Sequence, residues 1–236
     1  MPDQSPRRYV CRRTDEAPPI DGTLRHPAWA AAPWTEDFVD ILGPEPTPRL
    51  RTRAKLLWDD EFLYVGAELA EPHVWATLTE HNTMLFVENN FEIFIDPDGD
   101  GQNYYEFEIN CLGTTWELTL TKPYAAGGDA IDPTNLPGLR TAVCVDGTAN
   151  DPGDLDRGWS VEVALPWSGL ASYNVGRATP PAPGDEWRMN LMRIEWPHDV
   201  VDGNYRKGEG EDFWVWSPQY QPTMHAPETW GVVEFG

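Results

Sequence analysis

Basic residues are scarce in this chain of 236 residues. Lys and Arg number 17 against 39 Asp and Glu, which gives a formal net charge of −22. A protein that grips a phosphate backbone needs a positive surface, and an anionic membrane repels an acidic protein. We therefore expect no nucleic-acid partner and no membrane partner.

Long apolar runs are absent as well. No stretch approaches the roughly 20 apolar residues of a membrane-spanning helix. Residues 1–8 lack the apolar segment of a signal peptide. The location stays open: extracellular or periplasmic if a leader was removed from a precursor, and cytoplasmic otherwise.

Cysteine and histidine are few, and their spacing does not suit metal chemistry. Cys11, Cys111 and Cys144 form an odd set without a C-x-x-C pair. The sequence therefore predicts no disulfide framework and no thiolate zinc site, although one bridge could form. The five histidines show no H-E-x-x-H or H-x-x-x-H spacing, which argues against a zinc enzyme.

Proline and tryptophan are abundant, with 23 Pro and 12 Trp, and 40% of the residues are hydrophobic. Proline interrupts helices and central strands, so loops are expected to be many. Apolar and polar residues alternate in many short segments, which is the pattern of half-buried strands. These segments are 53–58, 62–69, 91–96, 104–110, 116–120, 139–145, 159–165, 187–196 and 231–235.

Short strands separated by turn residues predict an all-β fold, an antiparallel β-sandwich of the immunoglobulin or jelly-roll kind with little helix. Residues 26–32 and 166–170 are expected to form short helices. Residues 1–17 are predicted to be a loose N-terminal tail and 18–236 a single sandwich domain. Long loops, which often carry function, are predicted at 121–138, 168–186 and 197–212.

Several strings resemble motifs of the family 9 carbohydrate-binding modules. They are Ile20–Leu24 with Pro27–Trp29, Leu57–Val65, Phe91–Asp96, Gly158–Trp167 and Pro227–Gly231, in the order that the family has them. The resemblance covers residues 18–236. It implies a DOMON-like β-sandwich, often attached to xylanases, that binds sugars and structural calcium. Because a fold does not fix a function, each candidate site is argued separately.

Three aspartates form the clearest local motif. Asp96, Asp98 and Asp100 alternate with other residues before Gly101, as in the first half of an EF-hand calcium loop. A hard cation needs several oxygens, and Glu106 or backbone carbonyls could add to the set. An ordinary Asp-Gly turn is the alternative. The resemblance favours a structural Ca²⁺ held by Asp96, Asp98, Asp100 and Glu106.

A strip of polar residues lies on two neighbouring predicted strands. Glu92 is on one strand, and Glu106, Glu108 and Asn110 are on the next. If the strands pair, these carboxylates and the amide can hydrogen-bond sugar hydroxyls. A solvated sheet face is the alternative. The resemblance implies a sugar contact for Glu92, whereas Glu108 stands where the family's xylanase modules carry a basic residue.

Aromatic side chains stack on the C–H faces of sugars. Family modules hold a sugar between two Trp residues. The resemblance places Phe86 at the position of one and the segment 223–226, which contains His225, at the position of the other. Neither Trp is present here. We expect Phe86 to stack and His225 to hydrogen-bond. Further ligand candidates are Trp116, Trp196, Trp216 and Arg193. The better prediction for four other tryptophans is core packing: Trp29, Trp58, Trp159 and Trp230.

The sequence thus favours a protein that binds plant-type oligo- or polysaccharide, including xylan, and that is linked to or acts beside glycoside hydrolases. Two alternatives stay open. A glycoside-active enzyme would use a carboxylate pair among Glu92, Glu106 and Glu108, about 5 to 9.5 Å apart. A haem-binding DOMON relative would need an axial ligand such as Met84, Met224 or His225.

Overall fold

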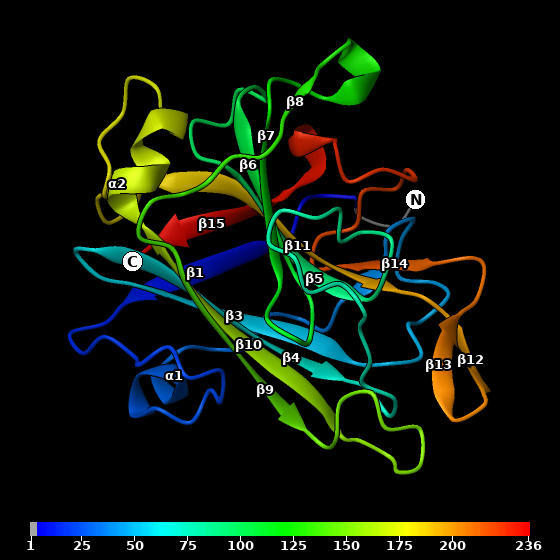
Figure 1. Ribbon diagram of the computed structural model, residues 1–236. Helices are drawn as coiled ribbons and strands as arrows, with labels where there is room; N and C mark the ends of the chain where they lie inside the picture. Colours follow the sequence, from blue (N-terminus) through cyan, green and yellow to red (C-terminus); the bar gives the residue numbers. More distant parts are fainter. Residues whose placement is uncertain (1–3) are drawn as a thin grey trace.

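Most of the chain forms one curled β-sheet, seen in the computed structural model, which describes residues 4–236 (Figure 1). The two halves of the sheet face each other across the core, as in a β-sandwich. In spatial order, the first half contains β8 (Ala130–Ile131), β7 (Thr115–Leu120), β6 (Tyr104–Ile109), β5 (Asn90–Asp96), β11 (Glu186–Glu195) and β15 (Gly231–Phe235). The order continues with β1 (Arg8–Arg13), β3 (Thr52–Trp58), β4 (Phe62–Ala70), β10 (Gly158–Pro166) and β9 (Arg140–Asp146).

Shorter elements complete the structure. β14 (Asp212–Val215) pairs with β11 and with β2 (Val39–Asp40). The hairpin of β12 (His198–Val201) and β13 (Asn204–Lys207) projects from one end of the sandwich (Figure 1). The helices are α1 (Pro27–Ala31), α2 (Trp167–Leu170) and the 3₁₀ turns η1 (Tyr124–Ala126), η2 (Ala171–Tyr173) and η3 (Pro227–Thr229).

β1 joins the two halves of the sheet, so the expected loose tail over residues 1–17 is wrong for residues 8–13; residues 1–3 of that tail lie outside the described part of the chain. Arg8–Cys11 pair with β15, and Arg12–Arg13 pair with β3. Both pairings are parallel, so the sheet is mixed, whereas we predicted a purely antiparallel one. Tyr9 and Cys11 are buried in the core because alternate residues of a strand point to the same side.

The alternation in the sequence located the other long strands. Each predicted segment corresponds to a strand whose ends lie within one residue of the prediction. The two predicted helices form as α1 and α2, and His26 caps α1 by accepting a hydrogen bond from Ala28 N at 3.3 Å. The segment 197–212 was predicted as a loop but contains the β12–β13 hairpin. Its four-residue strands are too short for the alternation to be recognised.

The first half of the sheet carries a second apolar cluster on its outer face. Phe94, Leu118 and Met192 pack there with Met224 and Trp230 from the C-terminal part of the chain. The polar residues that alternate along these strands are therefore covered. The solvated sheet face that we kept as an alternative is wrong for this region.

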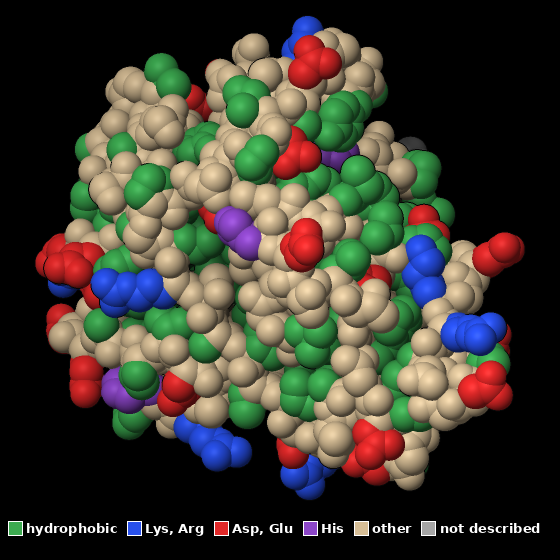
Figure 2. All heavy atoms as spheres, viewed as in Figure 1, with side chains coloured by type: hydrophobic (Ala, Val, Ile, Leu, Met, Phe, Trp, Pro, Cys, Tyr) green, Lys and Arg blue, Asp and Glu red, His purple; other side chains and the backbone are tan. Residues whose placement is uncertain are grey.

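The surface carries the excess acidic residues in a dispersed way. On the face seen in Figure 2, Asp and Glu side chains are scattered rather than gathered into one patch. Cys11, Cys111 and Cys144 are all free. Within residues 4–236, no helix has the length and apolar character that crossing a membrane requires.

Candidate functional site

A pocket of about 350 Å³ opens on the outer face of the first half of the sheet. Its floor comes from β5, β6, β7 and β11, and its walls from β14 and the segments around residues 86, 124 and 222–225. Six residues predicted from the sequence line it: Phe86, Glu92, Glu106, Glu108, Trp116 and His225. Most of the remaining lining is apolar: Ile41, Phe94, Leu118, Tyr124, Met192, Ile194, Phe213, Pro222, Thr223 and Met224.

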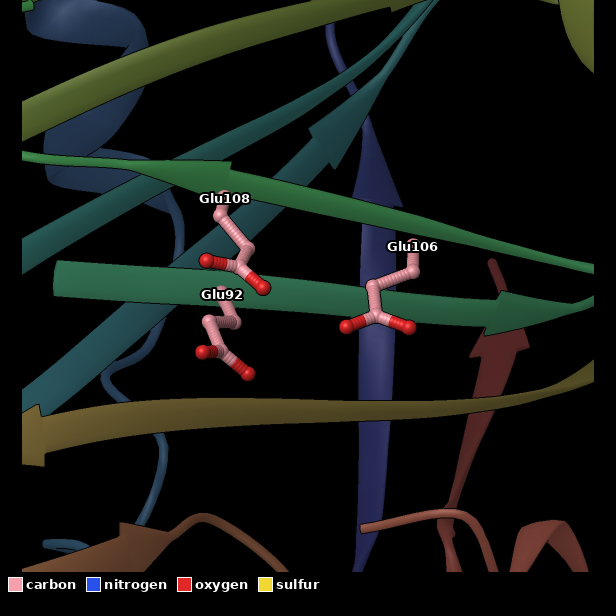
Figure 3. A group of neighbouring side chains, drawn as sticks. All are labelled: Glu92, Glu106 and Glu108. Atoms are coloured by element: carbon pink, nitrogen blue, oxygen red, sulfur yellow. The ribbon is translucent and has the colours of Figure 1, made fainter. Parts of the chain in front are cut away.

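Strand pairing brings three carboxyl groups together on the floor of the pocket. Glu92 of β5 lies directly opposite Glu108 of β6, and Glu106 lies two residues away on the same face. Figure 3 shows all three side chains extending to one side of these strands. One carboxylate oxygen of each lies within 4.8 Å of one from each of the others. The side chains are nearly inaccessible, with exposures of 1%, 5% and 1% for Glu92, Glu106 and Glu108.

Asn90 is the main polar partner of this carboxyl cluster. Its amide donates to Glu92 at 3.0 Å and to Glu108 at 2.7 Å. Glu106 Oε2 and Asn90 Oδ1 are buried without a hydrogen-bond partner. A buried polar atom without a partner costs about 1–3 kcal/mol. The cluster is therefore incompletely satisfied by the protein alone.

Burial changes the ionisation of these groups. Loss of solvation raises the pKa of Glu92 to about 8, although the hydrogen bond from Asn90 opposes this shift. Burial, followed by repulsion from Glu92, raises the pKa values of Glu106 and Glu108 well above the ordinary glutamate range. The cluster consequently holds protons near neutral pH.

Aromatic side chains form the rim of the pocket. Phe86 and Tyr124 are 42% and 48% exposed, and Phe86 lies 6.1 Å from Trp116, centroid to centroid, with ring planes inclined by 32°. The indole N–H of Trp116 donates to Asp132 at 2.8 Å and so ties the segment around Tyr124 to the sheet. Tyr124 was not predicted as a site residue. The available signal was its position in the long loop 121–138, the kind of loop that often carries function.

His225 closes the pocket beside Tyr124. Its Nδ1 is 2.9 Å from the Tyr104 hydroxyl, and its ring lies 4.6 Å from the Tyr124 ring, between centroids. Burial lowers the pKa of His225 to about 4. The side chain is therefore neutral near pH 7 and contributes no positive charge to the carboxyl cluster.

Four predicted ligand residues lie outside the pocket. The side chain of Asn110 bonds to Leu78 O and Glu88 and accepts from two backbone N–H groups, so it organises a turn. Arg193 is buried in ion pairs with Glu71 and Glu195 at 2.5 and 2.7 Å.

Trp216 is fully buried in the core between the two halves of the sheet. Trp196 lies beside the pocket, where its indole N–H donates to Phe86 O at 3.1 Å. It positions the segment that carries Phe86.

The three aspartates converge at the start of the β5–β6 connection. One carboxylate oxygen each from Asp96, Asp98 and Asp100 lies within 4.8 Å of the others. Asp96 also accepts hydrogen bonds from Gly99 N and Gly101 N, so it shapes the turn. Burial, with a smaller contribution from the neighbouring aspartates, raises the pKa of Asp96 to about 6. This all-oxygen donor set suits a hard cation, but Glu106 belongs to the pocket cluster.

The pocket does not suit a haem with two protein ligands. Met224 and His225 are consecutive residues on one wall, so they cannot bind opposite faces of one iron. Met84 is 49% exposed and does not line the pocket. The arrangement of aromatic rim and polar floor instead resembles a site for a small ring-shaped ligand.

A family model described as "Carbohydrate family 9 binding domain-like" matches residues 20–235. This chain belongs to that family. The family 9 domain is 25% identical over 121 residues to the exoglucanase XynX of Acetivibrio thermocellus, a match that covers 51% of this chain but 9% of the exoglucanase.

Two solved structures share the fold of this family 9 domain. Both are family 9 carbohydrate-binding modules from Caldicellulosiruptor kristjanssonii. The one in complex with cellotriose has a TM-score of 0.61 and 16% identity, over 97% of this chain and 93% of that one. The one in complex with glucose has a TM-score of 0.62 and is 17% identical, and the match covers 98% of this chain and 96% of that one.

Proposed function

We propose that this family 9 domain binds carbohydrate in the pocket over β5 and β6, without chemistry. The observation that carries the proposal is the combination of an exposed aromatic rim, Phe86 and Tyr124, with a floor that contains Trp116 and buried carboxyl groups. Sugars present C–H faces to aromatic rings and hydroxyls to carboxylates. The pocket supplies both kinds of contact within about 350 Å³.

The relatives indicate which sugars to test first. One related structure holds cellotriose, another holds glucose, and two relatives by sequence are named an exoglucanase and an endo-1,4-beta-xylanase. Pyranose units of plant-type glucans or xylan are therefore the first ligands to test. A place next to a glycoside hydrolase would concentrate such an enzyme on its polysaccharide.

We also propose that Asp96, Asp98 and Asp100 hold a structural Ca²⁺. Their converging oxygens support this, since Ca²⁺ takes six to eight oxygen ligands and water can fill the remaining positions. The ion would fix the β5–β6 connection, next to the strand that carries Glu106.

Titration calorimetry over a glycan panel tests the binding proposal. We expect saturable binding of at least one pyranose ligand, and a loss of about tenfold or more in Trp116→Ala, because the ring forms a wall of the pocket. Trp34→Ala is the matched control, since Trp34 lies over Arg53 and Lys55 at a different surface. No heat with any sugar would contradict the proposal.

The alternative of glycoside hydrolysis is tested in the same samples. Glu92 and Glu108 face each other and burial raises both pKa values, as an acid catalyst requires. Reducing-sugar release that disappears in Glu108→Gln would favour an enzyme. Binding without product supports the binding domain.

A further inference from the structure

The carboxyl cluster of the pocket lacks a positive partner. Among the described residues that line the pocket, none is Lys or Arg, and His225 is neutral because burial lowers its pKa to about 4. Other buried carboxylates have their oxygens satisfied within the protein: Glu71 and Glu195 share Arg193, and Glu162 accepts from three backbone N–H groups. The carboxyl cluster of the pocket has neither a cation nor a full set of donors.

The unpartnered atoms point to a ligand rather than to a structural role. Glu106 is 5% exposed, and its Oε2 has no hydrogen-bond partner. Asn90 Oδ1, in the same cluster, also lacks one. Asn90 Oδ1 is an acceptor, and Glu106 Oε2 is an acceptor when the carboxyl group is ionised, so a donor on a ligand could satisfy both.

The geometry of the cluster fits one nitrogen. Three atoms within 4.8 Å of one another share a point that lies no more than about 2.8 Å (4.8 Å divided by √3) from each. A charge-assisted N–H···O bond spans about 2.7–2.9 Å, so this upper limit allows one nitrogen to reach all three oxygens. An ammonium group has three N–H donors, one for each of Glu92, Glu106 and Glu108.

The surroundings favour an organic cation over a bare metal ion. The rest of the lining is largely apolar and aromatic, with Phe94 paired to Glu106 and Trp116 paired to Glu108 across neighbouring strands. Aromatic faces attract organic cations. Ca²⁺ needs six to eight oxygens, and the pocket leaves most of its volume for a larger molecule.

We propose that the pocket of this domain recognises a sugar bearing a protonated amine, such as a 2-amino-2-deoxy pyranose, with its ammonium group bound by Glu92, Glu106 and Glu108. This inference rests on the proposed carbohydrate binding. It changes one substituent of the expected pyranose, from a hydroxyl to an ammonium group. The ring stacks on the rim residues while the nitrogen reaches the floor.

Titration calorimetry with glucosamine, N-acetylglucosamine and glucose at pH 6 tests the inference. The three share a ring, but only glucosamine is cationic. We expect glucosamine to bind at least about tenfold more tightly than the other two. We also expect proton release, detected as a heat that depends on the buffer's ionisation enthalpy, because the ammonium replaces protons held by the carboxyl groups.

Variants locate the effect at the cluster. Glu106→Gln keeps the shape but removes a carboxyl group that can ionise against the ammonium group, so the ratio of glucosamine to glucose affinity falls towards one. Glu209→Gln removes an exposed charge outside the pocket lining and leaves the ratio unchanged. If Glu106→Gln fails to fold by circular dichroism, Glu92→Gln replaces it.

The outcomes separate the inference from the proposed function. Equal binding of glucose and glucosamine overturns the ammonium inference and leaves carbohydrate binding intact. Absence of binding by all three sugars, and by longer glycans, overturns both. Binding of Ca²⁺ alone that is lost in Glu106→Gln identifies a metal site and overturns the inference.

Discussion

At the scale of single residues, two buried acidic clusters have opposite surroundings. Glu71 and Glu195 enclose Arg193, whereas Glu92, Glu106 and Glu108 surround space that opens to the pocket. The first cluster is closed around its cation, although burial and repulsion from Glu195 raise the pKa of Glu71 to about 8. The second is open at the ligand side and destabilises the empty domain at high pH.

The first prediction concerns Arg193. Arg193→Met leaves Glu71 and Glu195 buried without a cation, so the free energy of unfolding falls by about 3–5 kcal/mol. Arg157→Met is the control, because Arg157 forms an exposed pair with Asp146 at 2.6 Å and the loss of such a pair leaves the free energy of unfolding nearly unchanged. Urea unfolding measures both; equal effects would contradict a structural role for Arg193.

The second prediction is a fall in stability with rising pH. Burial raises the pKa of Glu92 from 4.5 to about 8, so the folded state holds a proton that the unfolded state has lost. This stabilisation is complete below about pH 4.5 and disappears as the pH rises towards 8. His225 acts in the opposite direction only below its ordinary pKa of 6.5.

Between pH 6.5 and 8 we therefore expect the free energy of unfolding to decrease, by up to about 1.4 kcal/mol per pH unit for each such group. Glu92→Gln flattens the slope, whereas the exposed Glu209→Gln does not. Urea unfolding at several pH values measures this. A free energy of unfolding that rises from pH 6.5 to 8 would contradict the raised pKa values of the buried cluster.

The sequence was informative about some residues and silent about others. Alternation placed Glu92, Glu106 and Glu108 on one face, because a strand has a period of two. It did not reveal that the face is covered, since the cover comes from the distant segment 213–225. Arg193 looked like a ligand because its partner Glu71 lies 122 residues away.

At the scale of elements, β1 is the strand that the sequence concealed. Its residues, R-Y-V-C-R-R, are flanked by polar and proline-rich sequence. Both of its neighbours, β15 and β3, are distant in the chain and run parallel to it. Nothing local to the segment signals a strand, whereas the β3–β4 hairpin was evident because its two strands are separated by a short turn.

The third prediction tests β1. Removal of residues 1–13 separates β15 from β3 and uncovers the core around Tyr9 and Cys11, so we expect loss of the cooperative thermal transition. Removal of residues 1–5 retains β1 and is the control. If the chain without residues 1–13 melts cooperatively, with a Tm within a few degrees of that of the full chain, β1 does not join the two halves of the sheet.

The fourth prediction concerns the β5–β6 connection. If Asp96, Asp98 and Asp100 hold Ca²⁺, calcium at about 100 times its Kd raises stability by about 2.7 kcal/mol, seen as a higher Tm. Asp98→Asn with Asp100→Asn abolishes the gain. Asp151→Asn is the control, because Asp151 also accepts a hydrogen bond within a turn, from Gly153 N at 2.8 Å. An identical Tm with calcium and with chelator would contradict the proposal.

At the scale of the whole molecule, the net charge is −22, and ten Asp and Glu side chains of the described residues are buried. The sequence predicted the β-sandwich, because alternation and turns repeat along the chain. It did not predict the second apolar cluster, which turns one sheet face into a pocket. The site is therefore a property of the assembled fold, where β5, β6, β7 and β11 meet segments around residues 86, 124 and 225.

The central claim is that this pocket binds carbohydrate, and the indole N–H resonances of the 12 Trp residues test it most directly. Trp116 lies in the pocket wall, whereas Trp159 lies in the other half of the sheet. Trp116→Phe and Trp159→Phe assign the two signals. Titration with glucose, and then with glucosamine, is predicted to move the Trp116 signal saturably and leave Trp159 in place. An unmoved Trp116 signal, with either sugar at saturating concentration, would contradict the account.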